Sequence, residues 1–251
     1  MKELKNKNYS FLVLCACLFL HQPLFAEERL TIGVAANFML PFQEIAHKFE
    51  NKTSVRIDAT YTSTGNLYGQ IIHGAPYDLF LAADERRPER LLKEGLISDT
   101  FIYAQGRTVL WTAKKQLCAA KDWQEALMMP CINKISIANP ETAPYGAAAI
   151  AALKKASLEE VIINKLVFAQ NVVQAFQYAH TESVEAGFCA LSSVFSEQGK
   201  MGCYFLLEHA PVIIQRGCVL KDSKNRKLAE KFAAFLCSRD AQNIKTKFGY
   251  N

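Results

Sequence analysis

Short apolar segments alternate with amphipathic ones along most of the chain, and this alternation limits the possible folds more than any other feature. The first series runs LTIGVAA (30–36), PFQEIAHKFE (41–50), SVRIDATYT (54–62), LYGQIIHG (67–74), YDLFLAAD (77–84) and PERLLKEGLI (88–97). Apolar residues recur within 41–50 at helical spacing, which predicts a helix with one buried face. Such an alternation is typical of βαβ units that build a mostly parallel sheet covered by helices.

A second series of the same kind begins at residue 108. Its apolar segments are TVLWTAK (108–114), KISIAN (134–139), AGFCALS (186–192) and PVIIQRGCVL (211–220), and its amphipathic segments are 145–156, 172–180 and 225–238. Neither a low-complexity linker nor a sequence repeat separates the two series. The sequence therefore predicts two α/β units that are connected through strands rather than by a flexible tether.

The first 26 residues have the pattern of an export signal. Lys2, Lys5 and Lys7 precede the apolar stretch FLVLCACLFL, and PLFA offers a cleavage site after Ala26. In an alternative reading Cys17 is the lipid-bearing cysteine of a lipoprotein, although the apolar tail that follows it fits that pattern less well. In both cases we expect the chain to be periplasmic, with about 225 residues left to form one large or two smaller domains.

The charge balance argues against a nucleic-acid partner. Removal of the predicted signal, which holds three lysines and one glutamate, lowers the formal net charge from +5 to +3. This small excess is scattered, without interleaved basic and aromatic residues. No later segment reaches the ~18 uninterrupted apolar residues of a membrane span. We therefore expect a soluble protein that binds no nucleic acid. We also expect it to be a monomer.

Six cysteines remain after the predicted signal, an even number in a chain that enters an oxidising compartment. They permit 15 complete pairings, and none shows the Cys-x-x-Cys spacing of a metal site or redox motif. Disulfides and buried free thiols both remain open from the sequence. The residues are Cys118, Cys131, Cys189, Cys203, Cys218 and Cys237.

Four loops, each between an extended segment and a helix, carry small neutral hydrogen-bonding residues. In an open α/β sheet these loops lie at the carboxyl ends of the strands, where ligands bind. Converging helix N-termini offer backbone N–H groups and positive dipole ends, which hold an anion without a metal. No Arg or Lys lies inside the loops. The predicted caps and neighbours are Asn37, then Ser63 or Thr64, then Thr142 with Pro144 and Tyr145, and finally Asn171.

The titratable residues show no arrangement that an enzyme or a metal site needs. The five histidines lack metal-ligand spacing, and neither a nucleophile elbow nor a phosphate loop is present. The pairs Asp84–Glu85 and Glu159–Glu160, and the basic run ERRPER (85–90), are interpreted as solvated helix faces. An exported enzyme with the same fold would need a pair of titratable residues close to the ligand site that these loops form. We therefore expect reversible binding rather than catalysis.

Three segments carry a resemblance to the periplasmic molybdate-binding proteins, the solute receptors of molybdate ABC importers. They are AANF (35–38), the block from 61 to 97 that contains GAPYDLFLAAD, and IANPETAPYG (137–146). The resemblance covers nearly the whole chain after the signal. It implies a type II periplasmic binding protein with two doubly wound α/β domains joined by two crossover strands. Residues 27–108 and 210–251 would form domain I, and residues 109–209 domain II.

The resemblance also implies a ligand site for molybdate or tungstate, with molybdenum bound only as the oxoanion and no cofactor. Delivery to the membrane permease of an ABC transporter is implied as well. Sulfate, phosphate or a small organic acid would be the alternative ligands of the same fold. Where some members supply a Tyr after the fourth helix, this chain has Ala190. The matching site positions are Ala36, Asn37, Ser63 or Thr64, Tyr145, and Val172 or Val173.

Overall fold

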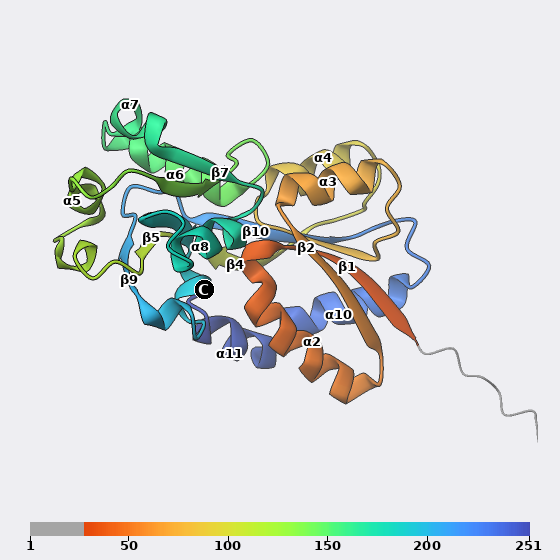
Figure 1. Ribbon diagram of the computed structural model, residues 1–251. Helices are drawn as coiled ribbons and strands as arrows, with labels where there is room; N and C mark the ends of the chain where they lie inside the picture. The colour runs from red at the N-terminus through yellow and green to blue at the C-terminus, as the bar shows by residue number, and fades with distance from the viewer. Residues whose placement is uncertain (1–27) are drawn as a thin grey trace, which may run out of the picture.

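The computed structural model describes residues 28–251, which form two α/β domains, each built on a five-stranded sheet (Figure 1). The first sheet has the strand order β2-β1-β3-β10-β4. Strand β1 is parallel to β2 and β3, whereas β10 is antiparallel to β3 and β4. The strands are β1 (Arg29–Ala35), β2 (Arg56–Thr62), β3 (Leu79–Ala82), β4 (Phe101–Gly106) and β10 (Ile213–Val219).

The second sheet has the order β7-β6-β8-β5-β9, with β6 parallel to β7 and β8, and β5 antiparallel to β8 and β9. The predicted fold class is confirmed, but both sheets are mixed. Strands β5 and β10 enter their sheets directly from the other domain, without the helical crossover that parallel pairing needs. The strands are β5 (Thr108–Thr112), β6 (Ile135–Ala138), β7 (Leu166–Ala169), β8 (Ala186–Ala190) and β9 (Cys203–Leu206).

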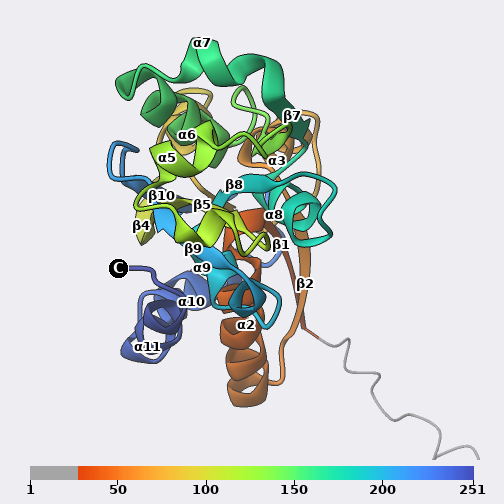
Figure 2. The same ribbon diagram turned by 60° about the vertical axis from the view of Figure 1, so that its left-hand side comes forward.

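Helices cover both faces of the first sheet. Helices α2, α10 and α11 pack together on one face (Figure 2), while α3 and α4 cover the other. Phe42, Ile45 and Phe49 of α2 are buried, so the predicted helical face is confirmed. The elements are η2 (Ala36–Phe38), α2 (Met39–Thr53), α3 (Thr64–Ile72), α4 (Arg86–Lys93), α10 (Arg226–Leu236) and α11 (Arg239–Lys247).

The second domain buries its apolar side chains in two clusters, in which Trp111 of β5 and Trp123 of α5 are both fully covered. Small alanines of α6 allow this helix to approach β6 and β8 closely. The elements are η3 (Leu117–Ala119), α5 (Trp123–Met128), α6 (Pro144–Lys155), α7 (Glu159–Ile162), η4 (Ile163–Lys165), α8 (Val172–His180), α9 (Leu191–Val194) and η5 (Gly199–Met201).

The chain passes between the two sheets twice. Arg107 alone separates β4 from β5, and residues 207–212 connect β9 to β10. After α11 the C-terminal tail returns to β4, where Asn251 O accepts a hydrogen bond from Gln105 N at 2.9 Å. The predicted domain limits, 27–108 with 210–251 and 109–209, stay a prediction. Thr108 itself pairs with Ala190 in the second sheet.

One disulfide, Cys118–Cys203, joins η3 to the edge strand β9 across 85 residues of sequence. Cys131, Cys189, Cys218 and Cys237 are free thiols, so both of the alternatives left open by the sequence occur in this chain. The predicted export signal and Cys17 lie outside the described residues. From residue 28 onward, no helix is long and apolar enough to span a membrane.

Candidate functional site

The N-terminal ends of helices from both domains meet at one small cavity. η2 and α3 approach it from the first domain, and α6 and α8 from the second. The empty space is about 200 Å³, including the part open to solvent. The enclosed part of the cavity measures only about 10 Å³, against about 300–1,000 Å³ for pockets that hold drug-sized ligands, so the cavity excludes large ligands. The lining residues, none with a charged side chain, are Ala35, Ala36, Asn37, Ser63, Thr64, Ala83, Ala143, Pro144, Tyr145, Asn171 and Val172.

All six predicted site residues therefore lie around the same cavity, although they come from four separate loops. Parallel strands place their following loops at one edge of each sheet, and the two domains face each other at these edges. The positive ends of the helices that start here favour a negative charge in the cavity. Such an arrangement can hold an anion through neutral groups.

Ser63 and Thr64 each stabilise the local backbone and still have a hydroxyl hydrogen that no other described residue accepts. Ser63 is the N-cap of α3, as predicted, and its Oγ accepts a hydrogen bond from Asn66 N at 3.3 Å. Thr64 Oγ1 accepts one from Ala83 N at 3.0 Å. Both hydroxyls thus act as acceptors towards the protein, and neither donates to an acceptor within residues 28–251. Each therefore keeps one O–H donor for a ligand.

Helix α8 has a backbone N–H beside the cavity that no other described residue accepts. Asn171 is its N-cap, as predicted, and Asn171 Oδ1 accepts hydrogen bonds from Val173 N and Gln174 N at 3.0 Å each. The N–H of Val172, a residue only 4% exposed, has no acceptor in the described part of the chain. Because the Val173 N–H is already bonded, the geometry favours Val172 of the two predicted alternatives.

Helix α6 begins differently from the prediction. Pro144 does occupy the first helical position, but Thr142 is not the cap, because the N-cap is Ala143 without a side-chain bond. Asn139 organises the turn instead: its carbonyl accepts from Thr142 N and Ala143 N. Pro144 has no N–H, so the first amide of α6 is that of Tyr145, which also lacks an acceptor among the described residues.

Asn37 is not an N-cap either, which corrects the second capping prediction. Helix α2 has no side-chain cap, and Asn37 lies inside the 3₁₀ turn η2 that precedes it. Its Nδ2 donates to Gln215 Oε1 at 2.8 Å and to Tyr250 Oη at 3.0 Å, with Tyr145 Oη at 3.4 Å. The side chain therefore joins a buried network behind the cavity, while the amides that start η2 face no intrahelical acceptor.

This network, formed by Asn37, Tyr103, Tyr145, Ser192, Gln215 and Tyr250, couples the two domains. Gln215 Oε1 also accepts from Tyr103 Oη at 3.0 Å, and Gln215 Nε2 lies 3.4 Å from Tyr145 Oη. Burial raises the pKa of Tyr103, Tyr145 and Tyr250, so these hydroxyls stay neutral. A neutral network beside the cavity adds no charge that would repel an anion.

Sequence reasoning did not find Tyr103, Ser192, Gln215 or Tyr250. They lie on β4, α9, β10 and the C-terminal tail, and no local pattern of caps or glycines marks them. The position of Gln215 within an apolar strand was the one available signal, because a fully buried polar residue needs partners.

The interpretation of ERRPER (85–90) as a solvated helix start is wrong at Arg87. Its side chain is buried, pairs with Asp84 just before α4, and donates from Nη2 to Glu141 O of the second domain at 2.7 Å. Arg86 beside it is exposed, as predicted. The run therefore contains one residue that connects the domains.

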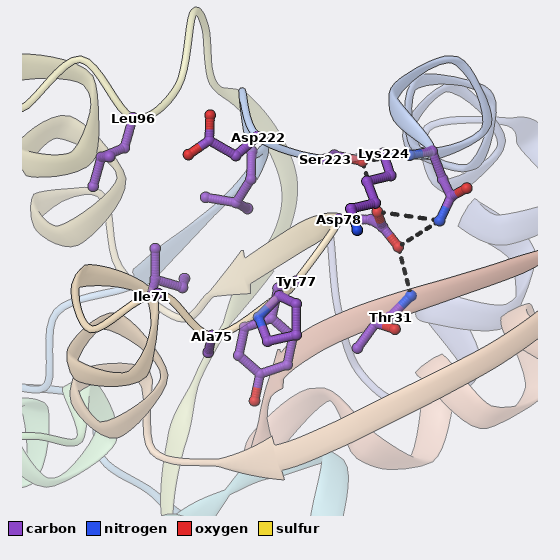
Figure 3. A pocket seen from close by; sticks show the side chains of 13 residues that line it. Thr31, Ile71, Ala75, Tyr77, Asp78, Leu96, Asp222, Ser223 and Lys224 are labelled. Atoms are coloured by element: carbon purple, nitrogen blue, oxygen red, sulfur yellow. Dashed lines mark hydrogen bonds between the residues drawn. The ribbon is translucent and has the colours of Figure 1, made fainter.

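A larger cavity at the opposite edge of the first sheet, lined in part by Tyr77 and Asp78, is poorly suited to an anion (Figure 3). Asp78 is buried there, and its carboxylate accepts from Thr31 N at 2.8 Å and from Ser223 Oγ at 2.6 Å. These bonds use the polar groups to hold β1, β3 and the segment before α10 together. Asp222 adds a second carboxylate, and Lys224 is the one cation among the lining side chains, so their formal charge stays negative and disfavours an oxoanion.

Two facing α/β domains with an interdomain cavity of neutral donors fit the class of extracellular solute-binding proteins. The chain belongs to the bacterial extracellular solute-binding protein family, whose model matches residues 30–251. The molybdate-binding protein ModA of Azotobacter vinelandii is 37% identical over 224 residues, which cover 87% of this chain and 88% of the relative. ModA of Rhodobacter capsulatus is 34% identical over 220 residues, with coverage of 87% and 86%.

The likeness extends to the solved structure of the Azotobacter vinelandii periplasmic molybdate-binding protein. The TM-score is 0.83 at 29% sequence identity, and the match covers 88% of this chain and 98% of that chain. Coverage at this level includes both domains and the cavity between them.

Proposed function

We propose that the protein is a periplasmic receptor, not an enzyme, that binds molybdate or tungstate between its domains and delivers it to the permease of an ABC importer. The observation that carries this proposal is the set of unused neutral donors at one cavity. The hydroxyls of Ser63 and Thr64 and the amides of Tyr145 and Val172 have no other acceptor among residues 28–251. The identity of the ModA relatives supports the choice of oxoanion.

The donor set determines which anions fit. An oxoanion that leaves water must recover its hydrogen bonds from fixed donors, because an unpaired buried charge is costly. The lining side chains include no carboxylate that could accept the proton that phosphate retains at neutral pH. Fully deprotonated tetrahedral dianions are therefore favoured. Among them, the longer metal–oxygen bonds of molybdate and tungstate distinguish these ions from sulfate by size.

The proposed ligand contacts are the backbone amides of Ala36, Asn37, Tyr145 and Val172 together with the hydroxyls of Ser63 and Thr64. The Asn37 side chain positions its own loop rather than the ligand, because its Nδ2 bonds Gln215 and Tyr250. The Tyr145 hydroxyl likewise faces the network. Export by the N-terminal signal, a monomeric state and action on a membrane permease belong to the same proposal.

Isothermal titration of residues 27–251 with molybdate, tungstate, sulfate and phosphate tests the proposal. We expect tight one-to-one binding of the first two and little heat from the others. Heat from sulfate alone would assign a different oxoanion, and no heat from any of the four would reject an oxoanion receptor.

Ser63→Ala and Thr64→Val, titrated in the same way, separate the two hydroxyls. Loss of one hydrogen bond to a charged ligand is expected to weaken binding by about tenfold or more. Unchanged affinity in both variants would show that the hydroxyls do not contact the ligand.

A further inference from the structure

Two hydrogen bonds connect the domains directly beside the cavity. The Gly65 N–H, on the first turn of α3, donates to Thr142 O at 2.8 Å, and Arg87 Nη2 donates to Glu141 O at 2.7 Å. Gly65 and Arg87 belong to the first domain, and residues 141–142 lie in the loop that leads into α6 of the second. Figure 1 shows α3 and α4 on the side of their domain that faces α6.

The contact at Gly65 has no room for a side chain. A Cβ at this position would lie 2.8 Å from Thr142 Cα, 2.9 Å from Thr142 Cβ and 2.9 Å from Arg87 Nη2. Such distances are below any ordinary carbon contact, and two of the three atoms belong to the facing domain. The requirement concerns space rather than backbone conformation, because Gly65 is part of a regular helix. A side chain at position 65 would therefore push the start of α3 away from Thr142.

Arg87 is held by a partner within its own domain. Its side chain is nearly buried and is paired with Asp84, which also accepts from Arg87 N at 3.1 Å. The charge is thus compensated within the first domain, and the remaining Nη2 donor reaches the Glu141 carbonyl. A hydrogen bond from a charged donor to a carbonyl is stronger than a neutral one.

We propose that Gly65 and Arg87 form a closure latch that sets ligand affinity without touching the ligand. Ser63 and Thr64 directly precede Gly65, and Tyr145 follows Glu141 and Thr142 by a few residues, so the latch brings donors of both domains to one cavity. The latch stabilises the closed state and so raises the fraction of protein that is closed. A ligand that binds the closed state then has a lower apparent Kd by the same factor. This inference rests on the proposed oxoanion receptor function.

Gly65→Ala tests the latch, with Gly69→Ala as the matched control. Both positions lie in α3, but a Cβ at Gly69 would meet no atom within 4 Å. Alanine favours helix formation at both sites, so neither variant should lower the thermal stability of the ligand-free protein. We expect Gly65→Ala to raise the Kd for molybdate by at least about tenfold, and Gly69→Ala to leave it unchanged.

Arg87→Gln, with Arg86→Gln as its control, removes the same formal charge from neighbouring positions of α4. If the latch operates, Arg87→Gln weakens binding by about tenfold and Arg86→Gln does not. Small-angle scattering at saturating ligand gives an independent readout. The radius of gyration should fall on ligand addition in the wild-type protein and in both controls, and fall less in Gly65→Ala.

The four oxoanions used above separate the two proposals. Each variant is titrated with the oxoanion that the wild-type protein binds most tightly. If that ion is not molybdate, the proposed ligand is wrong, but the effect of the latch on affinity can still be measured. Equal Kd values and equal compaction in Gly65→Ala and Gly69→Ala would overturn the latch while the receptor function stands. Binding of none of the four would overturn both.

Discussion

Asn37 illustrates how a residue can belong to a site without offering its side chain to the ligand. Its carbonyl accepts from Tyr250 Oη at 2.7 Å and from Ser192 Oγ at 2.8 Å, while its Nδ2 donates back to Tyr250 Oη. One hydroxyl of the C-terminal tail thus fixes both ends of the residue. The peptide whose amide is proposed to contact the ligand is thus held in place by residues distant in sequence.

Tyr250→Phe should therefore weaken both folding and binding. Removal of the hydroxyl takes one bond from the Asn37 carbonyl, which keeps Ser192 Oγ, and one from Nδ2, which keeps Gln215 Oε1. Each lost bond should lower the free energy of unfolding by about 0.5–1.5 kcal/mol. The loosened η2 turn should also raise the Kd for the oxoanion. Denaturant unfolding and titration measure the two effects. The exposed Tyr204 supplies the control Tyr204→Phe, and equal behaviour of the two variants would contradict the positioning role.

At the scale of single elements, Asn171 affects both the stability of α8, as its N-cap, and the position of the free Val172 N–H. Asn171→Ala removes the acceptor for Val173 N and Gln174 N, at an expected cost of about 1 kcal/mol in unfolding free energy. Fraying of the first turn would also displace the Val172 N–H and lower oxoanion affinity.

Ser238→Ala is the matched control, because Ser238 caps α11 away from the cavity through Ala241 N. It should show a comparable loss of stability in thermal unfolding and an unchanged Kd. If Asn171→Ala also left the Kd unchanged, the α8 amide would not be a ligand contact.

The disulfide Cys118–Cys203 gives a second prediction for elements, because it holds η3 against an edge strand of the second sheet. A bridge across a loop of this length contributes about 2–4 kcal/mol, mainly by restricting the unfolded chain. Cys118→Ser with Cys203→Ser should lower the unfolding free energy by this amount in denaturant titrations. The double variant should still bind the oxoanion, since neither cysteine lines the cavity.

Local signals in the sequence were sufficient for the buried strands and for helices α2, α3, α4, α6, α8 and α10, but not for α5, α7, α9 or α11. Ser63 and Asn171 carry cap chemistry that acts within three residues, so their roles could be predicted from the sequence. Strands β4, β7 and β9 were missed because they are short and partly exposed. The antiparallel pairing of β10, like the partners of Asn37, depends on segments more than 100 residues apart, and no local pattern specifies such contacts.

The molecule as a whole buries tyrosine hydroxyls where the domains meet, and this makes its stability sensitive to alkaline pH. Burial raises the pKa of Tyr103, Tyr145 and Tyr250, and raises the pKa of Tyr61 to about 12. In the unfolded chain these groups ionise near pH 10. Their contribution to stability is therefore complete below about pH 10, and is lost as the pH rises towards their folded pKa values.

Burial lowers the pKa of Lys245, whose Nζ donates to Tyr103 O at 2.6 Å. This group acts in the opposite direction, because the unfolded chain binds its proton up to about pH 10.5. Above that pH both states lose the proton, so only the tyrosines remain. Each tyrosine that is protonated when folded and ionised when unfolded lowers the unfolding free energy by up to about 1.4 kcal/mol per pH unit.

We therefore expect the unfolding free energy to fall steeply above about pH 10.5, with the buried tyrosines ionising together with unfolding rather than before it. Tyr145→Phe removes one titrating group and should reduce the slope, whereas the exposed-residue variant Tyr204→Phe should not. Urea unfolding at several pH values between about pH 8 and about pH 11 measures the slope. Equal slopes in the wild-type protein and in Tyr145→Phe would contradict a neutral network, and with it the inference that only neutral donors surround the anion.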